Sequence, residues 1–174
     1  MSDRPADLVT AGLRLVALTP DEAAAVIASG LPLPSGPLAD LEGSRGWPHA
    51  DTVDALGMHA EHGSIGPYCS WLVVVDGSVV GDVGCHGGPD SDGVVEIGYG
   101  IAAPSRRRGY ATEAVGALVS FLAVQPAVST IRASTHEGNS PSRHVLDRVG
   151  FVPIGREGDH GETVVYEHIA EGAT

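Results

Sequence analysis

The stretch Glu96-Ile-Gly-Tyr-Gly-Ile-Ala-Ala-Pro-Ser-Arg-Arg-Arg-Gly-Tyr-Ala-Thr112 decides the fold that we predict for this chain. Residues 94–101 are apolar except for Glu96 and predict a strand, and residues 110–124 carry apolar side chains at helical spacing. Three consecutive arginines and a glycine join the two segments. The first N–H groups of a helix lack partners within the helix, and its dipole adds partial positive charge there. We therefore expect a phosphate-bearing ligand at residues 106–112.

The rest of the chain supplies further strands and helices around this stretch. Alternating or β-branched apolar residues predict strands at 13–18, 71–75, 79–85, 94–101, 129–135, 151–154 and 163–169. Start and stop signals predict helices at 19–30, 51–62, 110–124 and 139–149. The dipeptide Asp76-Gly77 predicts a tight hairpin, and an antiparallel meander is the simplest arrangement of the three strands around it. The later order of strand, helix and strand predicts a parallel crossover.

Capping residues mark where the helices begin. Thr19 with Glu22 forms a capping box, Asp51 is the expected N-cap of the second helix, and Ser140 that of the last. Residues 31–48 hold four prolines and three glycines, which predicts a loop. Long ordered loops are often functional.

Composition bounds the function. The chain has 174 residues, 43% of them hydrophobic, which suits one globular domain. The net charge is −12 and every basic residue is Arg, which argues against nucleic-acid or anionic-membrane partners. No apolar run could span a bilayer, and the first ten residues lack the apolar core of a signal peptide, so we expect a cytoplasmic protein.

Several residues that could carry other chemistry have simpler interpretations. Cys69 and Cys85 are interpreted as buried small hydrophobic residues. His59 and His62 lie one helical turn apart, but no Cys or carboxylate cluster completes a ligand set. They are interpreted as a surface pair, and no metal is expected. Three aromatic residues fit a pocket or the core equally well: Trp47, Tyr68 and Trp71.

Two motifs carry a resemblance to a known family. Residues 106–111, Arg-Arg-Arg-Gly-Tyr-Ala, match the pattern Arg/Gln-x-x-Gly-x-Gly/Ala, and Glu96-Ile-Gly-Tyr precedes it at the usual spacing. Residues 139–151 match Asn-x-x-Ser-x-x-x-Leu-x-x-x-Gly-Phe. The chain thus resembles the GCN5-related N-acetyltransferases (GNAT superfamily), in the bacterial-type branch of ribosomal-protein-alanine and small-molecule acetyltransferases. The match is clear over 73–154 and thinner over the first 70 residues.

The resemblance implies the fold and its division. We expect an α/β (α+β) fold with a central mixed, mostly antiparallel sheet that splays at the middle and is flanked by helices. The whole chain, 1–174, would form a single N-acetyltransferase domain. Its signature core would cover 73–154, and residues 19–70 would form the acceptor side.

The resemblance also implies an acetyl-CoA site. Backbone N–H groups of residues 107–112 would hold the pyrophosphate, with the arginines adding charge, and residues 99–101 would diverge from the strand 129–135 to admit the pantetheine. Asn139 would bind the pantetheine arm, although a plain turn or cap role is the alternative. The expected cofactor-binding residues are Tyr99, Gly100, Ile101, Arg106, Arg107, Arg108, Gly109, Tyr110, Ala111, Thr112, Asn139 and Ser142.

Two residues are the expected catalysts. Glu96 would act as general base, because a primary amine has a pKa near that of lysine, ~10.4, and is mostly protonated at neutral pH. Many relatives use a Tyr on the last helix as general acid, but this chain has Leu146 there, so Ser142 is the expected substitute. An exposed strand position for Glu96 and a packing role for Ser142 are the alternatives.

The resulting hypothesis is acetyl transfer from acetyl-CoA to a primary amine by direct attack in a ternary complex. The acidic balance favours a small cationic acceptor. Acetylation of a protein N-terminus and a non-catalytic acyl-CoA-binding module are the alternatives. Homodimers are common in the family, and neither motif identifies the acceptor.

Overall fold

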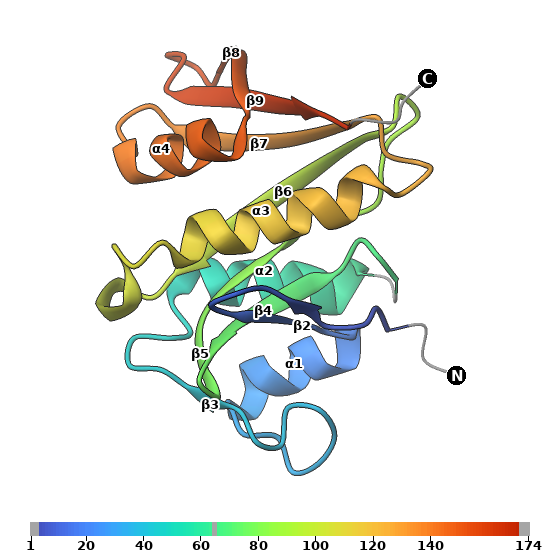
Figure 1. Cartoon of the computed structure of the whole chain (residues 1–174), viewed down its shortest axis with the longest axis vertical. Helices are drawn as coiled ribbons and strands as arrows, with labels where there is room; N and C mark the ends of the chain where they lie inside the picture. Colours follow the sequence, from blue (N-terminus) through green and yellow to red (C-terminus); the bar gives the residue numbers. More distant parts are fainter. Residues whose placement is uncertain (1–3, 64–65, 171–174) are drawn as a thin grey trace.

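The computed structural model describes residues 4–63 and 66–170, and in these residues it forms one nine-stranded sheet with helices on both faces (Figure 1). The strands are β1 (Leu8–Val9), β2 (Arg14–Ala17), β3 (Glu42–Gly43), β4 (Ser70–Val75), β5 (Ser78–Cys85), β6 (Val94–Ile101), β7 (Thr130–His136), β8 (Val152–Glu157) and β9 (Thr163–Ile169). The helices are α1 (Pro20–Ser29), α2 (Ala50–His62), α3 (Tyr110–Ala123) and α4 (Ser140–Val149), with a 3₁₀ turn at Ala103–Ser105.

The sheet is mixed and mostly antiparallel, as expected. Its order is β1-β2-β4-β5-β6-β7-β9-β8, and β3 pairs with β5 off this path. The meander β4-β5-β6 is antiparallel, whereas β6 and β7 are parallel and are joined through α3. At the β4–β5 hairpin, Asp76 has φ 49° and Gly77 φ 79°. Positive φ at both central residues is what a type I′ turn requires, so the hairpin prediction is confirmed.

The sheet splays in its centre. Strands β6 and β7 pair from Val94 with Thr130 to Ile97 with Ala133, and the pairing ends there. On the other side β6 remains paired with β5 up to Ile101. Residues 98–101 therefore leave β7 while staying attached to the N-terminal half of the sheet. The expected divergence of these two strands is confirmed.

Two apolar layers hold the helices against the sheet. On one face α1 and α2 pack with alternate strand residues such as Val16 and Leu72. On the other face α3 and α4 pack with the strand residues in between, such as Leu15 and Trp71, which are the sequence neighbours of Val16 and Leu72. Figure 1 shows α3 in front of the sheet and α2 fainter behind it. This alternation is the period-two pattern of strands buried on both faces.

The helix starts confirm some of the expected caps and correct others. Thr19 and Glu22 form the expected capping box of α1. The N-cap of α2 is His49 and not Asp51, because the His49 ring accepts the Thr52 N–H and the helix starts at Ala50. The N-cap of α4 is Asn139 and not the expected Ser140, because Asn139 accepts the N–H of Ser142 at 3.2 Å.

The loop at residues 31–48 is anchored rather than open. Its apolar side chains enter the layer beneath α1 and α2, among them Leu33, Leu38, Leu41 and Trp47. The short strands β1 and β3 were not expected, since two-residue strands leave no periodic signal. No helix in the described residues has the length and apolar character needed to cross a bilayer.

Candidate active site

The splay brings a tyrosine from the sheet to the start of α4. Tyr99 lies on β6 just beyond the last pair with β7, and its hydroxyl lies 2.8 Å from Ser142 Oγ and donates to the Ser142 carbonyl at 3.1 Å. Burial raises the pKa of Tyr99, and the hydrogen bond to Ser142 partly offsets that rise. Of the expected site residues, Tyr99, Ser142 and Asn139 are thus placed together at the C-terminal side of the splay.

The arginine loop leads into a helix N-terminus that no side chain caps. Within residues 4–63 and 66–170, α1, α2 and α4 each begin with a side chain bonded to a backbone N–H, whereas α3 begins at Gly109 without one. Gly109 has φ 81° and ψ 0°, a left-handed conformation that favours glycine. The N–H groups of the first turn of α3 are therefore available to an anion.

The three arginines directly precede this helix start. Their residues are exposed, and Arg106 Nε donates to the Ile101 carbonyl at 2.9 Å, which ties the loop to the end of β6. Arg107 has φ 62°, so the loop turns sharply just before Gly109. The arrangement suits a phosphate: oriented N–H groups at a helix end, positive charge around them and no acidic side chain within the loop itself.

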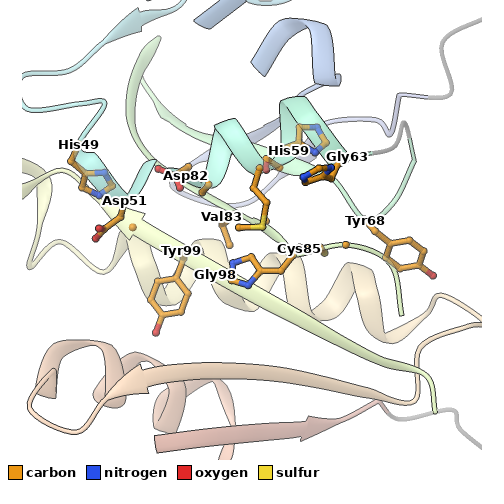
Figure 2. Close-up of a pocket in the computed structure, with 18 residues that line it drawn as sticks. His49, Asp51, His59, Gly63, Tyr68, Asp82, Val83, Cys85, Gly98 and Tyr99 are labelled. Carbon is orange, nitrogen blue, oxygen red and sulfur yellow. The ribbon is translucent and has the colours of Figure 1, made fainter. Parts of the chain in front are cut away.

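On the α2 side of the sheet, a cavity of about 390 Å³ opens beside the same segment of β6. It lies between α2 and the ends of β5 and β6 (Figure 2). The lining is polar at several points and includes His49, Asp51, Tyr68, Asp82, His86 and Tyr99. This size suits a small molecule.

One wall of the cavity holds a hydrogen-bonded network formed by α2, its N-cap residue and β5. The Thr52 hydroxyl donates to Asp82 and contacts His49 Nδ1, which also accepts the Thr52 N–H at 3.2 Å. Asp82 is buried, and this desolvation raises its pKa. Because Nδ1 is an acceptor, the hydrogen of the neutral His49 ring lies on Nε2. Figure 2 shows His49 and Asp82 side by side on the α2 side of the cavity.

Glycines on β6 form the floor of the cavity. A Cβ on Gly98 would lie 2.6 Å from His86 Nε2, and one on Gly100 would lie 2.7 Å from His49 Nε2. The two imidazoles therefore occupy space that a side chain at these positions would fill. The Gly-Tyr-Gly sequence of β6 thus places two histidines over one face and Tyr99 on the other.

Glu96 lies at the edge of this cavity rather than in it. Its side chain is half-exposed, and its Oε1 lies 3.9 Å from Nδ1 of His86, which lines the cavity. Glu96 is in register with Arg132 on β7. Arg132 in turn forms an ion pair with Glu167 at 2.6 Å, and that hydrogen bond is the main reason why the pKa of Arg132 is raised.

The structure changes the interpretation of several other residues. His59 is buried and its Nε2 lies 3.0 Å from the Leu18 carbonyl, so the expected surface pair with His62 is wrong. The described residues hold no group of three or more metal-ligating side chains. Cys69 and Cys85 are free and buried, as expected. Burial raises the pKa of Cys69 to about 12 and keeps both thiols protonated.

For Trp47 and Trp71, the choice between a pocket and the core is resolved in favour of the core. Trp71 is fully buried and meets Phe121 edge to face, with ring centroids 5.4 Å apart. Trp47 is buried beneath α1 and α2. Tyr68 is the member of this set that lines the cavity. Residues 64 and 65, in the expected acceptor region, lie outside the described residues.

Sequence reasoning missed three cavity residues. Asp82 had a signal, because it interrupts an apolar strand just as Glu96 does. His49 and His86 had none: one follows a proline-rich loop and the other follows the last residue of β5. Only the folded chain places them over the glycines of β6.

Comparisons with known proteins agree with this architecture. The uncharacterized N-acetyltransferase YjdG of Bacillus subtilis (strain 168) is 32% identical over 113 residues, which cover 61% of this chain and 67% of that protein. The structure of ribosomal-protein-S5-alanine acetyltransferase from Vibrio fischeri has a TM-score of 0.67 at 14% identity and covers 98% of this chain and 100% of its own.

A second structure has coenzyme A bound. RimL, a ribosomal L7/L12 alpha-N-protein acetyltransferase in complex with coenzyme A, has a TM-score of 0.64 at 16% identity and covers 95% of this chain and 99% of its own. The sequence model described as "Acetyltransferase (GNAT) domain" matches residues 13–152. With a splayed mixed sheet and an uncapped α3 beside the arginine loop, this chain belongs to the GNAT family of N-acetyltransferases.

Proposed function

We propose that this enzyme transfers the acetyl group of acetyl-CoA to the primary amine of a small cationic molecule. One observation carries the proposal: residues 98–101 of β6 connect an anion site at the start of α3 with a cavity that contains acidic side chains. A donor held at the first and an acceptor held in the second would meet at the splay.

The donor side has the features that acetyl-CoA requires. The pyrophosphate suits the free N–H groups of residues 110–112 and the charge of the three arginines. The pantetheine is peptide-like and suits the edge of β6 that β7 leaves unpaired after Ile97. When bound, acetyl-CoA would supply the activated acetyl group, and the residues of the splay would orient it.

The acceptor side favours a positively charged amine. Asp51 and Asp82 line the cavity, and no Arg is present among its described lining residues. The Nε2–H of His49 adds a hydrogen-bond donor beside Gly100, which suits an oxygen atom elsewhere on the acceptor. We infer an acceptor that carries both an amine and a hydroxyl or carbonyl group.

The reaction needs the amine in its neutral form. Glu96 is the proposed base, and because it lies at the cavity edge beside His86, the proton would pass through His86 or an intervening water. The amine then attacks the thioester carbon, the C–N bond forms as the C–S bond breaks, and Ser142 provides a proton to the departing sulfur.

The test is thiol release from acetyl-CoA, measured with a panel of amines matched in size but differing in charge. We expect release to depend on the amine and kcat/KM to be at least tenfold higher for hydroxylated cationic amines than for neutral ones. Preference for peptide N-termini would favour a protein acceptor instead. Binding of acetyl-CoA without release by any amine or peptide would favour a non-catalytic module.

A further inference from the structure

The site lacks an acid where many relatives of this enzyme carry one. Leu146, on α4, is fully buried and packs in the apolar layer. Its side chain has no proton to donate. The proton that the departing sulfur needs must therefore come from another side chain.

Tyr99 is the side chain that reaches the same place from the sheet. It is the last aromatic residue of β6, and its hydroxyl crosses the splay to the first turn of α4, 2.8 Å from Ser142 Oγ. Figure 2 shows its ring pointing away from His49 and Asp82, toward the part of the chain that holds α4. Tyr99 also lines the cavity, so it lies between the proposed donor and acceptor sites.

The hydrogen bonds give the hydroxyl pair a defined direction. A carbonyl oxygen can only accept, so the Tyr99 hydrogen is directed at the Ser142 carbonyl, and the Ser142 hydroxyl is then free to donate to the Tyr99 oxygen. The Ser142 carbonyl and Ser142 Oγ are both possible acceptors of the Tyr99 hydrogen. A small rotation of the Tyr99 hydroxyl therefore moves its hydrogen from the Ser142 carbonyl to Ser142 Oγ.

The environment of Tyr99 keeps its proton in place at neutral pH. Burial raises the pKa of the phenol above its ordinary value of 10.0. Ser142 is fixed as well, because its N–H is held by the cap Asn139 at 3.2 Å. The two hydroxyls are thus pre-positioned by β6 and by the N-terminus of α4.

We propose that Tyr99 and Ser142 form a two-hydroxyl relay that supplies the proton to the departing sulfur, in place of a tyrosine on α4. This rests on the proposed function. Ser142 Oγ gives its proton to the sulfur, which keeps the electron pair of the broken C–S bond. Tyr99 gives its own proton to Ser142 Oγ, and the phenolate then recovers a proton from solvent on the α4 side of the splay. A cationic amine loses two protons, one before it attacks and one as the amide forms. Glu96 takes each in turn and passes it to solvent, while one proton enters through Tyr99, so the overall reaction is balanced.

Tyr99→Phe tests the relay, because it keeps the ring and removes only the hydroxyl. We expect kcat to fall about 10- to 100-fold, with the KM for acetyl-CoA changed less than about twofold. Ser142→Ala should show a similar loss. The double variant should be little slower than either single one, because both hydroxyls act in one relay.

A second readout does not depend on turnover. The ultraviolet absorbance of the thiolate reports the thiol pKa of coenzyme A bound to the enzyme without an acceptor. The Ser142 hydroxyl donates to the sulfur and stabilises the thiolate, and Tyr99 strengthens that donor by donating to Ser142 Oγ, so Tyr99→Phe should raise this pKa by about one unit relative to the wild-type complex. A hydroxyl with a merely structural role would not move it.

Tyr166→Phe is the matched control. Tyr166 is also buried, and its hydroxyl accepts a single hydrogen bond from Arg143 at 3.1 Å. We expect unchanged kcat and unchanged thiol pKa in this variant. Wild-type values of both quantities in Tyr99→Phe, or loss of coenzyme A binding together with kcat, would overturn the relay. Absence of amine-dependent release in the wild type would instead overturn the proposed function.

Discussion

Glu96 lies between ionisable groups of the neighbouring strands. His86 lies on one side of it, and on the other Arg132 is already engaged by Glu167. Its side chain shares a face of β6 with Gly98 and Gly100, which form the cavity floor, whereas Tyr99 projects from the opposite face. The proposed base and the proposed acid relay would therefore act from opposite faces of one strand, three residues apart.

Glu96→Gln should slow catalysis without affecting donor binding. The amide has nearly the same shape but cannot take a proton, so kcat/KM at pH 7 should fall about 100-fold. The defect should shrink as the pH rises toward ~10, because more of the amine is then neutral without help. A pH–rate profile measures this, and calorimetry should show unchanged acetyl-CoA affinity.

Glu157→Gln is the control for this experiment. It changes a Glu at the exposed end of β8 in the same way and should leave the profile unchanged. Equal rates for Glu96→Gln and the wild type at every pH would remove Glu96 as the base.

At the level of elements, α3 differs from α1, α2 and α4 because its N-cap residue is a glycine, Gly109. The backbone turns through left-handed conformations at Arg107 and Gly109, and the helix then presents its first N–H groups without a protein acceptor from a capping side chain. An acidic residue in this place would provide such an acceptor. It would also bring negative charge to the position proposed for the pyrophosphate.

Gly109→Asp should weaken acetyl-CoA binding at least tenfold. The substitution should also lower the free energy of unfolding, because a non-glycine residue at this positive φ costs about 1–2 kcal/mol of backbone strain. Gly77→Asp provides the matched comparison, since Gly77 has φ 79° and, like Gly109, nothing within 4 Å of an added Cβ. We expect similar losses of stability in both variants by denaturant unfolding, but loss of binding by calorimetry only in Gly109→Asp. Equal affinities would contradict the anion site.

The elements also show what the sequence could predict. Long periodic segments such as α3 and β9 were located almost to the residue, because many side chains contribute to their pattern. Thr19 was recognised as a cap because Glu22 completes a local motif. His49 was not, because its capping role depends on the ring's orientation after a proline-rich loop. The cavity network could not be predicted for the same reason: His49 and Asp82 meet through Thr52, and His86 joins them in the cavity lining, by tertiary packing and not through sequence spacing.

At the scale of the whole molecule, a buried histidine couples stability to pH. His59 joins α2 to the residue after β2 through its contact with the Leu18 carbonyl, and burial lowers its pKa. As the pH falls below the ordinary His pKa of 6.5, His59 becomes protonated in the unfolded chain while it is still neutral in the folded chain. The free energy of unfolding should therefore fall with acidification, by up to about 1.4 kcal/mol per pH unit.

Denaturant unfolding between pH 8 and pH 5.5 measures this effect. Asp82 acts in the opposite direction, but its raised pKa starts from 3.8, so its contribution grows at the acidic end of the range. His59→Gln keeps a donor for the Leu18 carbonyl and cannot titrate near neutrality, so the slope should flatten. His62→Gln, on the exposed side of the same helix, should retain it. A slope unchanged in His59→Gln would assign the pH dependence to other groups.

The glycine floor of the cavity has a consequence for how the enzyme could diversify. Gly84, Gly98 and Gly100 already have the smallest possible side chains, so substitution at these three positions can only make the cavity smaller. Enlargement has to come from the bulkier lining residues, such as Met58 on α2. Relatives that acquire bulkier acceptors should therefore keep these glycines and differ in the larger side chains opposite them.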